Sequence, residues 1–325
     1  MVLFEDALLT INQAIDTMVY ENKPADLYKP IQYILSLGGK RIRPALVLLA
    51  YNLYKEDVEK TLDVAIGWEV FHNFTLLHDD LMDKADRRRG KETAHKKWND
   101  NTAILSGDAM LILAYRYIAK APADKLKEIL DLYSTTAAEI CGGQQYDMEF
   151  ESRMDVREEE YLEMIRLKTA VMLGACLQSG AILAEATAGD AAKLYDFGIN
   201  IGLAFQLKDD LLDVFGNPEQ FGKNIGGDIL CNKKTFLLIN ALQLAKGEEK
   251  KALQHWLTVS DTALNEQKIK AVTHIYTSLG LQELTERKMQ DYFQKAIHCL
   301  QALEKGRERT GILLGLAETL MDRTI

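Results

Sequence analysis

The spacing of apolar residues along this chain is that of amphipathic helices. Apolar side chains recur at every third or fourth position, and no apolar–polar alternation longer than four residues occurs, as half-buried strands would need. Only five of the 325 residues are prolines, whereas the helix formers Ala, Leu, Glu and Lys are abundant. The helical spacing runs through 5–20, 44–55, 61–83, 102–119, 124–150, 159–184, 190–215, 234–245, 262–278 and 283–302. The sequence therefore predicts an all-α protein.

The predicted helices follow one another without a linker between them. The chain contains no low-complexity tract and no stretch rich in Pro, Gly and Ser. Interruptions fall at Gly38-Gly39, 84–100, Ala121-Pro122, Gly189 and 216–228. Ligand sites in helical bundles are built from side chains on facing helices. We therefore expect a single domain over 1–325, a helical bundle around a deep central cavity.

Two copies of the pattern Asp-Asp-x-x-Asp each close an apolar helical run. They lie in FTLLHDDLMD and FQLKDDLLD and comprise Asp79, Asp80, Asp83, Asp209, Asp210 and Asp213. Residues four apart share a helix face, so carboxylates at this spacing repel one another unless a cation lies between them. Mg²⁺ takes oxygen ligands and binds through a few carboxylates together with substrate phosphates. The two triads therefore predict a Mg²⁺-dependent diphosphate site.

A solvated acidic surface is the simpler explanation of one such triad. At this Asp content a single match arises by chance in roughly one chain in ten, and an acidic cluster on a helix is usually a solvated face. Here, however, both copies follow Phe and Leu and carry apolar residues at the two x positions. Two matches in the same context favour a functional site.

Basic clusters interrupt the predicted helices of this acidic chain. They are Gly38-Gly39-Lys40-Arg41-Ile42-Arg43-Pro44, Arg87-Arg88-Arg89-Gly90, the FGKNIGGDI segment with Lys223, and Lys233-Lys234-Thr235. Glycine permits close backbone approach, and guanidinium groups hold phosphate bidentately. His72 lies two helical turns before Asp79 on the same face, whereas His78 faces elsewhere, for which we expect a structural role. The clusters together predict a site for two diphosphates.

Charge and cysteine usage exclude several other classes of protein. A formal net charge of −9 argues against a general nucleic-acid binder. The four cysteines match no zinc or CxxC pattern, so we expect a reducing, cytoplasmic environment. The first residues, MVLFEDALLTINQ, do not have the features of a signal peptide, and no apolar run approaches the ~20 residues of a membrane span.

The chain resembles the trans-prenyl diphosphate synthases, also called polyprenyl synthetases. The shared motifs occur in the family's order over 38–235 and are GGKRIRP (38–44), LLHDDLMD with RRG (76–90), Gly143-Gln144-Gln145-Tyr146-Asp147, Lys168-Thr169, FQLKDDLLD (205–213), GKNIGGDI (222–229) and KKT (233–235). The resemblance implies the all-α isoprenoid synthase fold and a homodimer. It also implies a Mg²⁺-dependent transferase that joins isopentenyl diphosphate to an allylic diphosphate.

The resemblance also assigns roles to individual residues. Mg²⁺ that bridges to the allylic diphosphate would be bound by Asp79, Asp80, Asp83, Asp209 and Asp210, with Asp213 more peripheral. The allylic diphosphate itself would be held by Arg88, Lys168, Lys223 and Lys233. Isopentenyl diphosphate would be held by Lys40, Arg43, His72 and Arg89. Thr169 and Gln206 would face the allylic cation.

Product length is expected to depend on the helix turns that precede the first triad. Thr75 and Phe71 lie four and eight residues before Asp79, on its helix face. The family resemblance instead implicates Phe74, on the flank of that helix, as the residue that first limits the chain. The pair Phe74-Thr75 most resembles geranylgeranyl diphosphate synthases. We therefore expect a C20 product, with a C15 farnesyl product as the close alternative.

Two rival functions share parts of this pattern. A terpene cyclase shares the fold and the first triad, but its second metal motif usually mixes Asn, Ser or Thr with Glu. A non-catalytic partner subunit of a prenyl synthase typically loses aspartates from one triad. Both triads are intact here, and Lys40 and Arg43 are available for a second diphosphate. The sequence therefore favours a synthase.

Overall fold

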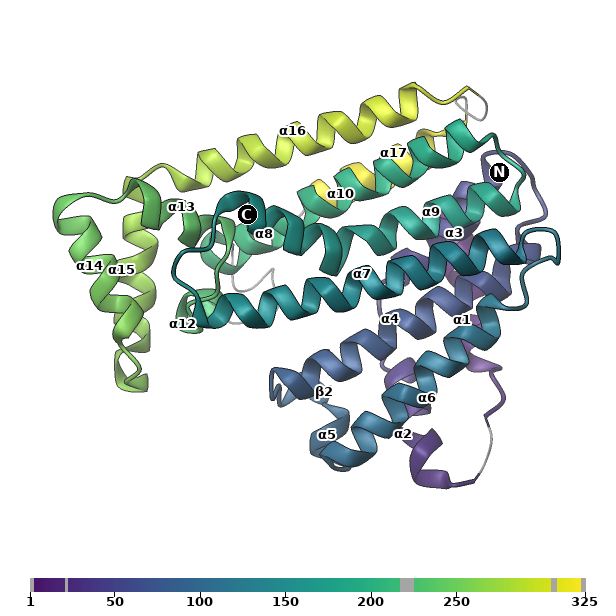
Figure 1. The fold of residues 1–325 in the computed structure, drawn as a ribbon, viewed down its shortest axis with the longest axis horizontal. Coiled ribbons are helices and arrows are strands. Elements are labelled where there is room, and N and C mark those ends of the chain that lie inside the picture. Colours follow the sequence, from purple (N-terminus) through teal and green to yellow (C-terminus); the bar gives the residue numbers. More distant parts are fainter. Residues whose placement is uncertain (1–2, 21–22, 217–224, 305–308, 323–325) are drawn as a thin grey trace. The chain divides into compact units, whose positions relative to one another are not determined.

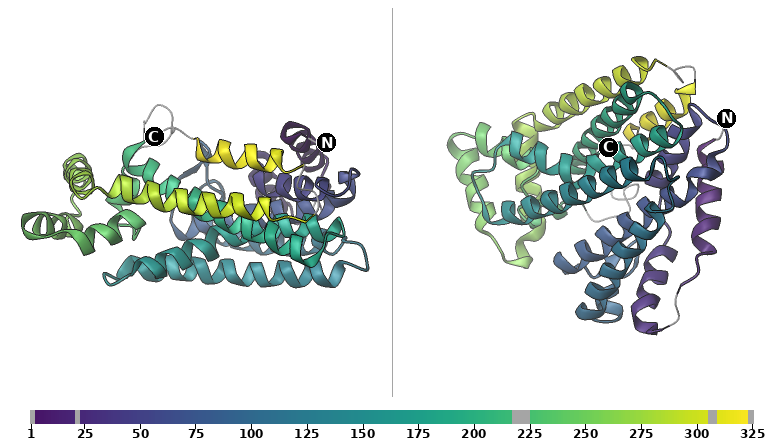
Figure 2. Two further views of the ribbon diagram at one scale, coloured as in Figure 1. Left: turned by 90° about the horizontal axis from the view of Figure 1, so that it is seen from above. Right: turned by 45° about the vertical axis from the view of Figure 1, so that its right-hand side comes forward.

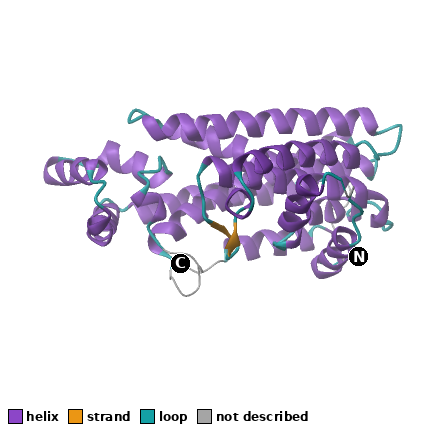
Figure 3. Cartoon of the chain, turned by 90° about the horizontal axis from the view of Figure 1, so that it is seen from below, coloured by secondary structure: helices purple, strands orange, loops and turns teal. Residues whose placement is uncertain are grey.

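The computed structural model describes residues 3–20, 23–216, 225–304 and 309–322. Helices provide nearly all of the regular structure within these ranges, and the strands form one short hairpin (Figure 3). The predicted all-α class is therefore confirmed. No helix in the described ranges combines the length and the apolar character needed to cross a bilayer.

The chain, whose helices are labelled in Figure 1, divides into two compact units. The first unit comprises 1–135, 175–195 and 303–312, and the second comprises 136–174, 196–302 and 313–325. Several helices contribute residues to both units, namely α7 (Leu126–Ser152), α9 (Val171–Leu183), α10 (Ala188–Phe215) and α17 (Gly311–Met321). The single-domain organisation remains a prediction, and each unit is described by itself.

The first unit is built mainly from the N-terminal helices. Besides parts of the shared helices it contains α1 (Phe4–Asp16), α2 (Ala25–Ser36), α3 (Ile42–Asn52), a 3₁₀ turn (Val58–Thr61), α4 (Leu62–Met82), β1 (Arg87–Arg88), β2 (Lys91–Glu92), α5 (Ala94–Lys97) and α6 (Asp100–Ile118). Helix α4 packs against α3 and α6, and α3 is buried along its length from Pro44 to Asn52. The helix that carries the first triad is therefore fixed on two sides.

The second unit surrounds the other triad with the remaining helices. It contains α8 (Glu158–Ile165), a π-helical turn (Arg166–Ala170), α12 (Gly227–Leu230), α13 (Phe236–Leu244), α14 (Gly247–Thr258), a 3₁₀ turn (Thr262–Leu264), α15 (Asn265–Ser278) and α16 (Leu281–Gln301). Its apolar core includes Leu207 and Leu211 of α10 and Leu237 of α13. Helices α14 and α15 lie side by side, as Figure 2 also shows.

Among the described residues, three α-helices longer than four residues were not predicted from the apolar periodicity. Helix α2 contains Pro30, which counts as a helix breaker in a sequence, yet its apolar face is buried through Ile31, Ile34 and Leu35. Helix α14 buries only Leu253, so its sequence carries almost no apolar stripe. Helix α17 falls beyond the last predicted segment. None of the three carries a predicted site residue.

Candidate active site

The first Asp triad lies at the C-terminal end of α4. Asp79 and Asp80 belong to the last helical turn, and Asp83 is the C-cap residue, whose N–H donates to the Asp79 carbonyl over 2.9 Å. Asp80 is only 2% exposed, whereas Asp83 is exposed to solvent. The triad therefore ends the helix with one buried and one solvent-facing carboxylate.

Arg88 of the β-hairpin holds the buried carboxylate of this triad. Its Nε lies 2.8 Å from both Asp80 oxygens, and its Nη2 lies 2.8 Å from Asp80 Oδ1 and 3.6 Å from Asp79 Oδ2. Burial raises the pKa of Asp80, although the Arg88 charge opposes the shift. The first predicted phosphate-binding arginine thus pairs with the buried carboxylate of the first triad.

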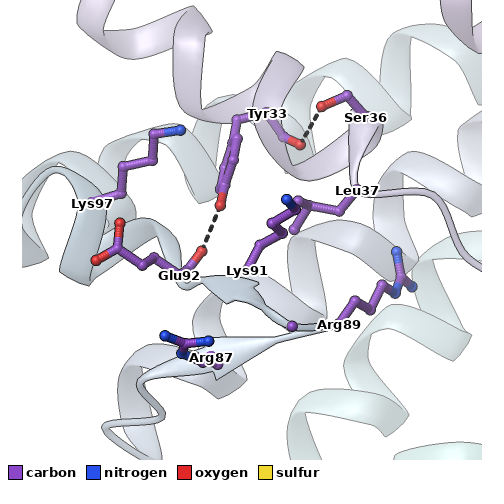
Figure 4. Close-up of a pocket in the computed structure, with 9 residues that line it drawn as sticks. Tyr33, Ser36, Leu37, Arg87, Arg89, Lys91, Glu92 and Lys97 are labelled. Atoms are coloured by element: carbon purple, nitrogen blue, oxygen red, sulfur yellow. Dashed lines mark hydrogen bonds between the residues drawn. The ribbon is translucent and has the colours of Figure 1, made fainter.

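The consecutive arginines of the hairpin point in different directions. A pocket of about 510 Å³ lies beside the hairpin. Figure 4 shows that Arg87 and Arg89, which line it, point apart. Arg89 donates from Nη1 to the Gly38 carbonyl, and a Cβ on Gly39 would lie 2.7 Å from Arg89 Nη2. Gly39, at φ +141°, therefore leaves the space in which the Arg89 guanidinium lies.

Arg43 and His72 form a second group in the first unit. Arg43 Nη1 lies 3.2 Å from His72 Nε2. Burial and the surrounding arginines hold the pKa of His72 well below its usual value, so the ring is neutral and accepts at Nε2. Lys40 is exposed three residues before Arg43. The residues predicted to hold isopentenyl diphosphate thus include one neutral acceptor among cations.

Arg41 supports the site but was not predicted to do so, because a cation among other cations is expected to lie at the surface. It adopts a left-handed conformation (φ 47°) and is 4% exposed. Its Nη1 lies 2.6 Å from Glu69 Oε1, and its Nη2 donates to the Leu35 carbonyl over 2.7 Å. A buried ion pair with α4 therefore anchors the segment between Lys40 and Arg43, where α3 begins. Only the glycines before it in the sequence hint at this unusual backbone.

Asp210 is the buried member of the second triad, on α10. It is 4% exposed and accepts hydrogen bonds from the Tyr161 hydroxyl and, over 3.3 Å, from Gln206 Nε2. Burial, together with the charge of Asp228, raises the pKa of Asp210 to about 7. Tyr161 was not predicted as part of the site. Its contact spans 49 residues along the chain, a separation that helical spacing cannot reveal.

Asp209 is half-buried one position earlier, and Asp213 lies one turn later. Asp213 Oδ2 accepts from the Asp228 N–H over 2.9 Å, and the Asp213 carbonyl accepts from the Gly226 N–H. Asp213 is thus engaged with the loop that follows α10. Lys223, in the same loop, lies outside the described residues.

Lys168 and Thr169 lie in the π-helical turn of the second unit. A Cβ on Gly143 would come within 2.3 Å of the Lys168 backbone nitrogen, and one on Gly202 within 2.6 Å of Ala170 Cα. Glycines on α7 and α10 therefore let both helices approach the turn closely. Single π-helical turns within α-helices occur often at functional sites. The glycine at position 143 of the shared motif is therefore explained by the close packing of α7 against the π-helical turn.

The π turn forms one wall of a cleft in the second unit. The cleft is lined by Asp147, Tyr161, Met164, Ile165, Lys168, Thr169, Gln206, Asp210, Lys233 and Thr235. Lys168 Nζ lies 2.7 Å from Asp147 Oδ2, and Thr169 Oγ1 donates to Gln206 Oε1 over 3.3 Å. Burial alone would raise the pKa of Asp147, but Lys233 and Lys168 bring it below its usual value. The structure thus gathers most of the residues assigned to the allylic substrate in this unit.

A cluster of aromatic rings packs around the turns of α4 that precede the first triad. The Phe74 ring lies 5.6 Å from that of Phe71, and Phe71 lies 5.2 Å from Tyr133 and 6.3 Å from Trp68. Phe71 is 1% exposed, whereas Phe74 and Thr75 are half-buried. Phe74 is therefore the more accessible ring, and Phe71 belongs to the core behind it. His78 contacts the Ile104 carbonyl and fills the space beside Gly107, which is a structural role.

The donor set suits Mg²⁺ even though neither triad forms a closed cage. Within the described residues, no three acidic, His or Cys side chains converge as a ready-made metal site. Mg²⁺ keeps several waters and binds through one or two carboxylates plus substrate phosphates, so it needs no all-protein cage. The carboxylates of Asp79 and Asp209 are half-buried rather than sealed in the core. The oxygen-only chemistry of both triads fits this mode of binding.

Aspartate triads with phosphate-binding cations on an all-α fold define the class of isoprenoid diphosphate enzymes. A family model described as polyprenyl synthetase matches residues 24–276, and the chain belongs to that family. It is accordingly a prenyltransferase.

Individual relatives match over 70% to 100% of this chain. A geranylgeranyl diphosphate synthase of Methanosarcina mazei is 35% identical over 322 residues, covering 96% of this chain and 94% of the relative. A farnesyl diphosphate synthase of Bacillus subtilis is 39% identical over 241 residues, covering 70% and 81%. A crystal structure of a geranylgeranyl pyrophosphate synthase matches with a TM-score of 0.95 and 43% identity over 100% of both chains. The predicted family and the isoprenoid synthase fold are confirmed.

Proposed function

We propose that the protein condenses isopentenyl diphosphate with an allylic diphosphate to make a short all-trans prenyl diphosphate. The observation that carries this proposal is the cleft of the second unit. Two lysines suited to a diphosphate, Lys168 and Lys233, line it together with the oxygen-bearing side chains of Thr169 and Gln206 and the buried Asp210. Phosphate-binding and cation-stabilising groups in one cleft match the needs of allylic ionisation.

Mg²⁺ is the proposed metal, held by carboxylates of the two triads. Bound there, it would supply positive charge against the oxygens of the allylic diphosphate. Asp79, Asp80, Asp83, Asp209 and Asp210 are the proposed ligands. Asp213 is the peripheral member, since one of its oxygens already accepts from the Asp228 N–H.

The chemistry proposed for the chain's own residues is electrostatic. When the allylic C–O bond breaks, its electron pair goes to the diphosphate, whose growing charge Arg88, Lys168 and Lys233 would stabilise. The oxygen dipoles of Thr169 and Gln206 would stabilise the allylic carbocation. The alkene of isopentenyl diphosphate then forms the new C–C bond, and the released diphosphate takes the proton lost from the adjacent carbon. No side-chain nucleophile is required.

The second diphosphate would be held in the first unit. Lys40, Arg43, His72 and Arg89 are the proposed contacts to isopentenyl diphosphate. A neutral His72 can donate from Nδ1 while Nε2 accepts from Arg43, so it adds a hydrogen bond without adding charge. The Arg41–Glu69 pair supports this arrangement from the core.

A homodimer in the cytoplasm completes the proposal. Ile104, Leu105 and Ile112 on α6 are 42%, 60% and 63% exposed, which makes this helix the surface that a second copy would cover. All four cysteines are free thiols, as suits a reducing compartment. Sedimentation of the wild type and of Leu105→Lys/Ile112→Lys tests the assembly. A monomeric wild type would contradict it.

The proposed product is geranylgeranyl diphosphate, with farnesyl diphosphate as the alternative. The pair Phe74-Thr75 supports this length by its resemblance to geranylgeranyl diphosphate synthases, and Phe74 is the accessible ring before the first triad. The same lengths occur among the names of the similar proteins described above.

Incubation with Mg²⁺, isopentenyl diphosphate and allylic primers of increasing length tests the function. We expect elongation, which distinguishes a synthase from a terpene cyclase and from an inactive subunit. Asp79→Ala and Asp209→Ala should each reduce turnover by orders of magnitude and leave the helical circular dichroism unchanged. Asp63→Ala and Asp196→Ala, at exposed positions of the same two helices, are the matched controls. Near-normal turnover in either triad variant at saturating Mg²⁺ would refute the two-triad proposal.

A further inference from the structure

Lys268 of α15 is a buried cation, only 2% exposed. Within the described ranges, the hydrogen-bond partners of its ammonium group are uncharged. This group donates to three oxygens, which are Asn232 Oδ1 at 2.8 Å, the Leu230 carbonyl at 3.3 Å and the Val259 carbonyl at 3.4 Å. All three proton donors of the lysine are therefore used on uncharged oxygens.

Two of these oxygens belong to the segment that ends α12. Helices α12 and α15 lie side by side in the second unit (Figure 1). Asn232 adopts the left-handed conformation, φ 53°, and its Nδ2 donates to the Leu257 carbonyl over 3.0 Å. Its amide side chain is thus held at both ends, by Lys268 and by the last turn of α14. A residue in this unusual conformation is fixed rather than free to relax.

The main chain of Asn232 is held as well. Lys234 is 5% exposed, and its Nζ lies 3.1 Å from the Asn232 carbonyl and 3.3 Å from the Glu151 carbonyl. Thr235 then caps α13 by accepting from the Leu238 N–H. Of the two consecutive lysines, Lys234 thus holds the backbone of this segment.

Lys233 remains as the cation that this held segment presents to the cleft. It lines the cleft together with Asp147 and Lys168, while its own N–H donates to the Asp228 carbonyl over 2.9 Å. Its side chain is exposed, and its charge helps to lower the pKa of Asp147 in the cleft. The backbone of the neighbouring residues fixes the point from which this side chain extends.

We propose that Lys268 is a positioning residue for the diphosphate site, acting through Asn232 to fix the backbone from which Lys233 reaches the allylic diphosphate. The proposal rests on the proposed function and adds to it a residue outside the shared sequence motifs. Lys268 touches no substrate.

The energetics argue against a purely structural lysine. Burying an ammonium group costs free energy that neutral acceptors only partly return, and an apolar side chain of similar volume would fill the same space at lower cost. A cation is useful here because it can gather three oxygens from two separate loops. This cost is outweighed if the cation keeps a substrate-binding loop in place, because small misplacements of a binding group reduce turnover strongly.

The test measures whether Lys268 and Lys233 act on the same step. Lys268→Met keeps the aliphatic stem and removes the three hydrogen bonds, and Lys233→Met removes the proposed phosphate contact. We expect each to raise the KM for the allylic diphosphate about tenfold, while the KM for isopentenyl diphosphate changes less than about twofold. If Lys268 acts through Lys233, the double variant should show the KM of Lys233→Met alone.

A second variant keeps the test valid if Lys268→Met unfolds. Asn232→Gly preserves the left-handed conformation but removes the acceptor of Lys268, so it should raise the allylic KM in the same way. Lys270→Met, an exposed lysine on the same helix, is the matched control and should behave as the wild type.

The outcomes separate the inference from the function on which it rests. Multiplicative effects in the double variant, an equal rise of both KM values, or an unchanged KM in both Lys268→Met and Asn232→Gly would overturn the inference alone. An unchanged allylic KM in Lys233→Met would overturn the role of Lys233 and the inference with it. A wild type without elongation activity would instead overturn the proposed function.

Discussion

Arg88 donates from Nε to both carboxylate oxygens of Asp80, each 2.8 Å away. The same relation recurs in the second unit, where Lys168 lies 2.7 Å from Asp147. In each unit a cation assigned to the allylic diphosphate is thus paired with an acid of the protein. Diphosphate binding would exchange a carboxylate partner for a phosphate partner, so these cations are held in position beforehand and incur less ordering cost on binding.

Replacement of Arg88 should therefore weaken allylic substrate binding and disturb Asp80 as well. Arg88→Lys keeps a charge but loses the planar fork, and we expect the allylic KM to rise about tenfold. Arg88→Ala also leaves Asp80 buried without its partner, so the melting temperature should fall by several degrees. Steady-state kinetics and calorimetry measure the two effects. The control is Arg87→Ala, whose side chain points away from Arg89 (Figure 4). Equal losses in the Arg87 and Arg88 variants would contradict this account.

The two diphosphate sites should respond separately to mutation. Arg43→Ala should mainly raise the KM for isopentenyl diphosphate, because Arg43 contacts His72 in the first unit. Lys168→Ala should mainly raise the KM for the allylic diphosphate, because Lys168 lines the cleft with Thr169 and Gln206. Kinetics in which each substrate is varied at saturation of the other will distinguish them. If Arg43→Ala raised only the allylic KM, the assignments would be reversed.

The sequence allowed the helices and the charged site residues to be predicted, because both leave local patterns. Apolar spacing places α4 and α10 where they are observed, and the Asp triads follow from residues four apart on those helices. Arg88 is identified by its place in a motif after the first triad. Local patterns are sufficient wherever the interacting residues share one helix or one loop.

Residues whose role depends on distant partners could not be predicted in this way. Tyr161 meets Asp210 across 49 positions, and Arg41 meets Glu69 across 28. Neither spacing has a local signature. The left-handed backbone of Arg41 has no signature in arginine itself, which rarely adopts it, and only the preceding glycines hint at it. The packing of Gly143 on α7 against Lys168 in the π-helical turn could be recognised only from the structure.

The pH dependence of metal binding should follow Asp210. Its pKa is raised to about 7 by burial, and a metal ligand must be ionised to bind. The apparent Mg²⁺ affinity should therefore weaken as the pH falls from 8 through 7 to 6. Activity measured against Mg²⁺ concentration at each pH tests this. An affinity that is constant over this range would contradict a role for Asp210 as ligand.

Asp210 should also make the stability of the metal-free enzyme depend on pH. Here a rise in pH is unfavourable, whereas for Mg²⁺ binding it is favourable. A carboxyl group whose folded pKa is raised contributes stability that is fully present below its unfolded pKa of about 4 and is lost as the pH rises through about 7. Asp210→Asn, which keeps an acceptor for Tyr161, should therefore melt at least ~2 °C above the wild type at pH 8. The difference should shrink as the pH is lowered from about 7 toward about 4. Asp196→Asn on the same helix is the exposed control, and it should show no such trend.

Product length should be limited first by Phe74 and then by Phe71. Phe74 is half-buried and lies against Phe71, which is 1% exposed and packs on Trp68 and Tyr133. Removing the accessible ring in Phe74→Ala opens space without emptying the core, so the products should lengthen at little cost in stability. Phe71→Ala instead creates a core cavity and should destabilise the protein by about 3–5 kcal/mol. Chromatography of the dephosphorylated products, with Phe74→Tyr as the control that keeps the ring, measures the shift. A wild-type product of C30 or more, or no lengthening in either alanine variant, would show that the chain is stopped elsewhere.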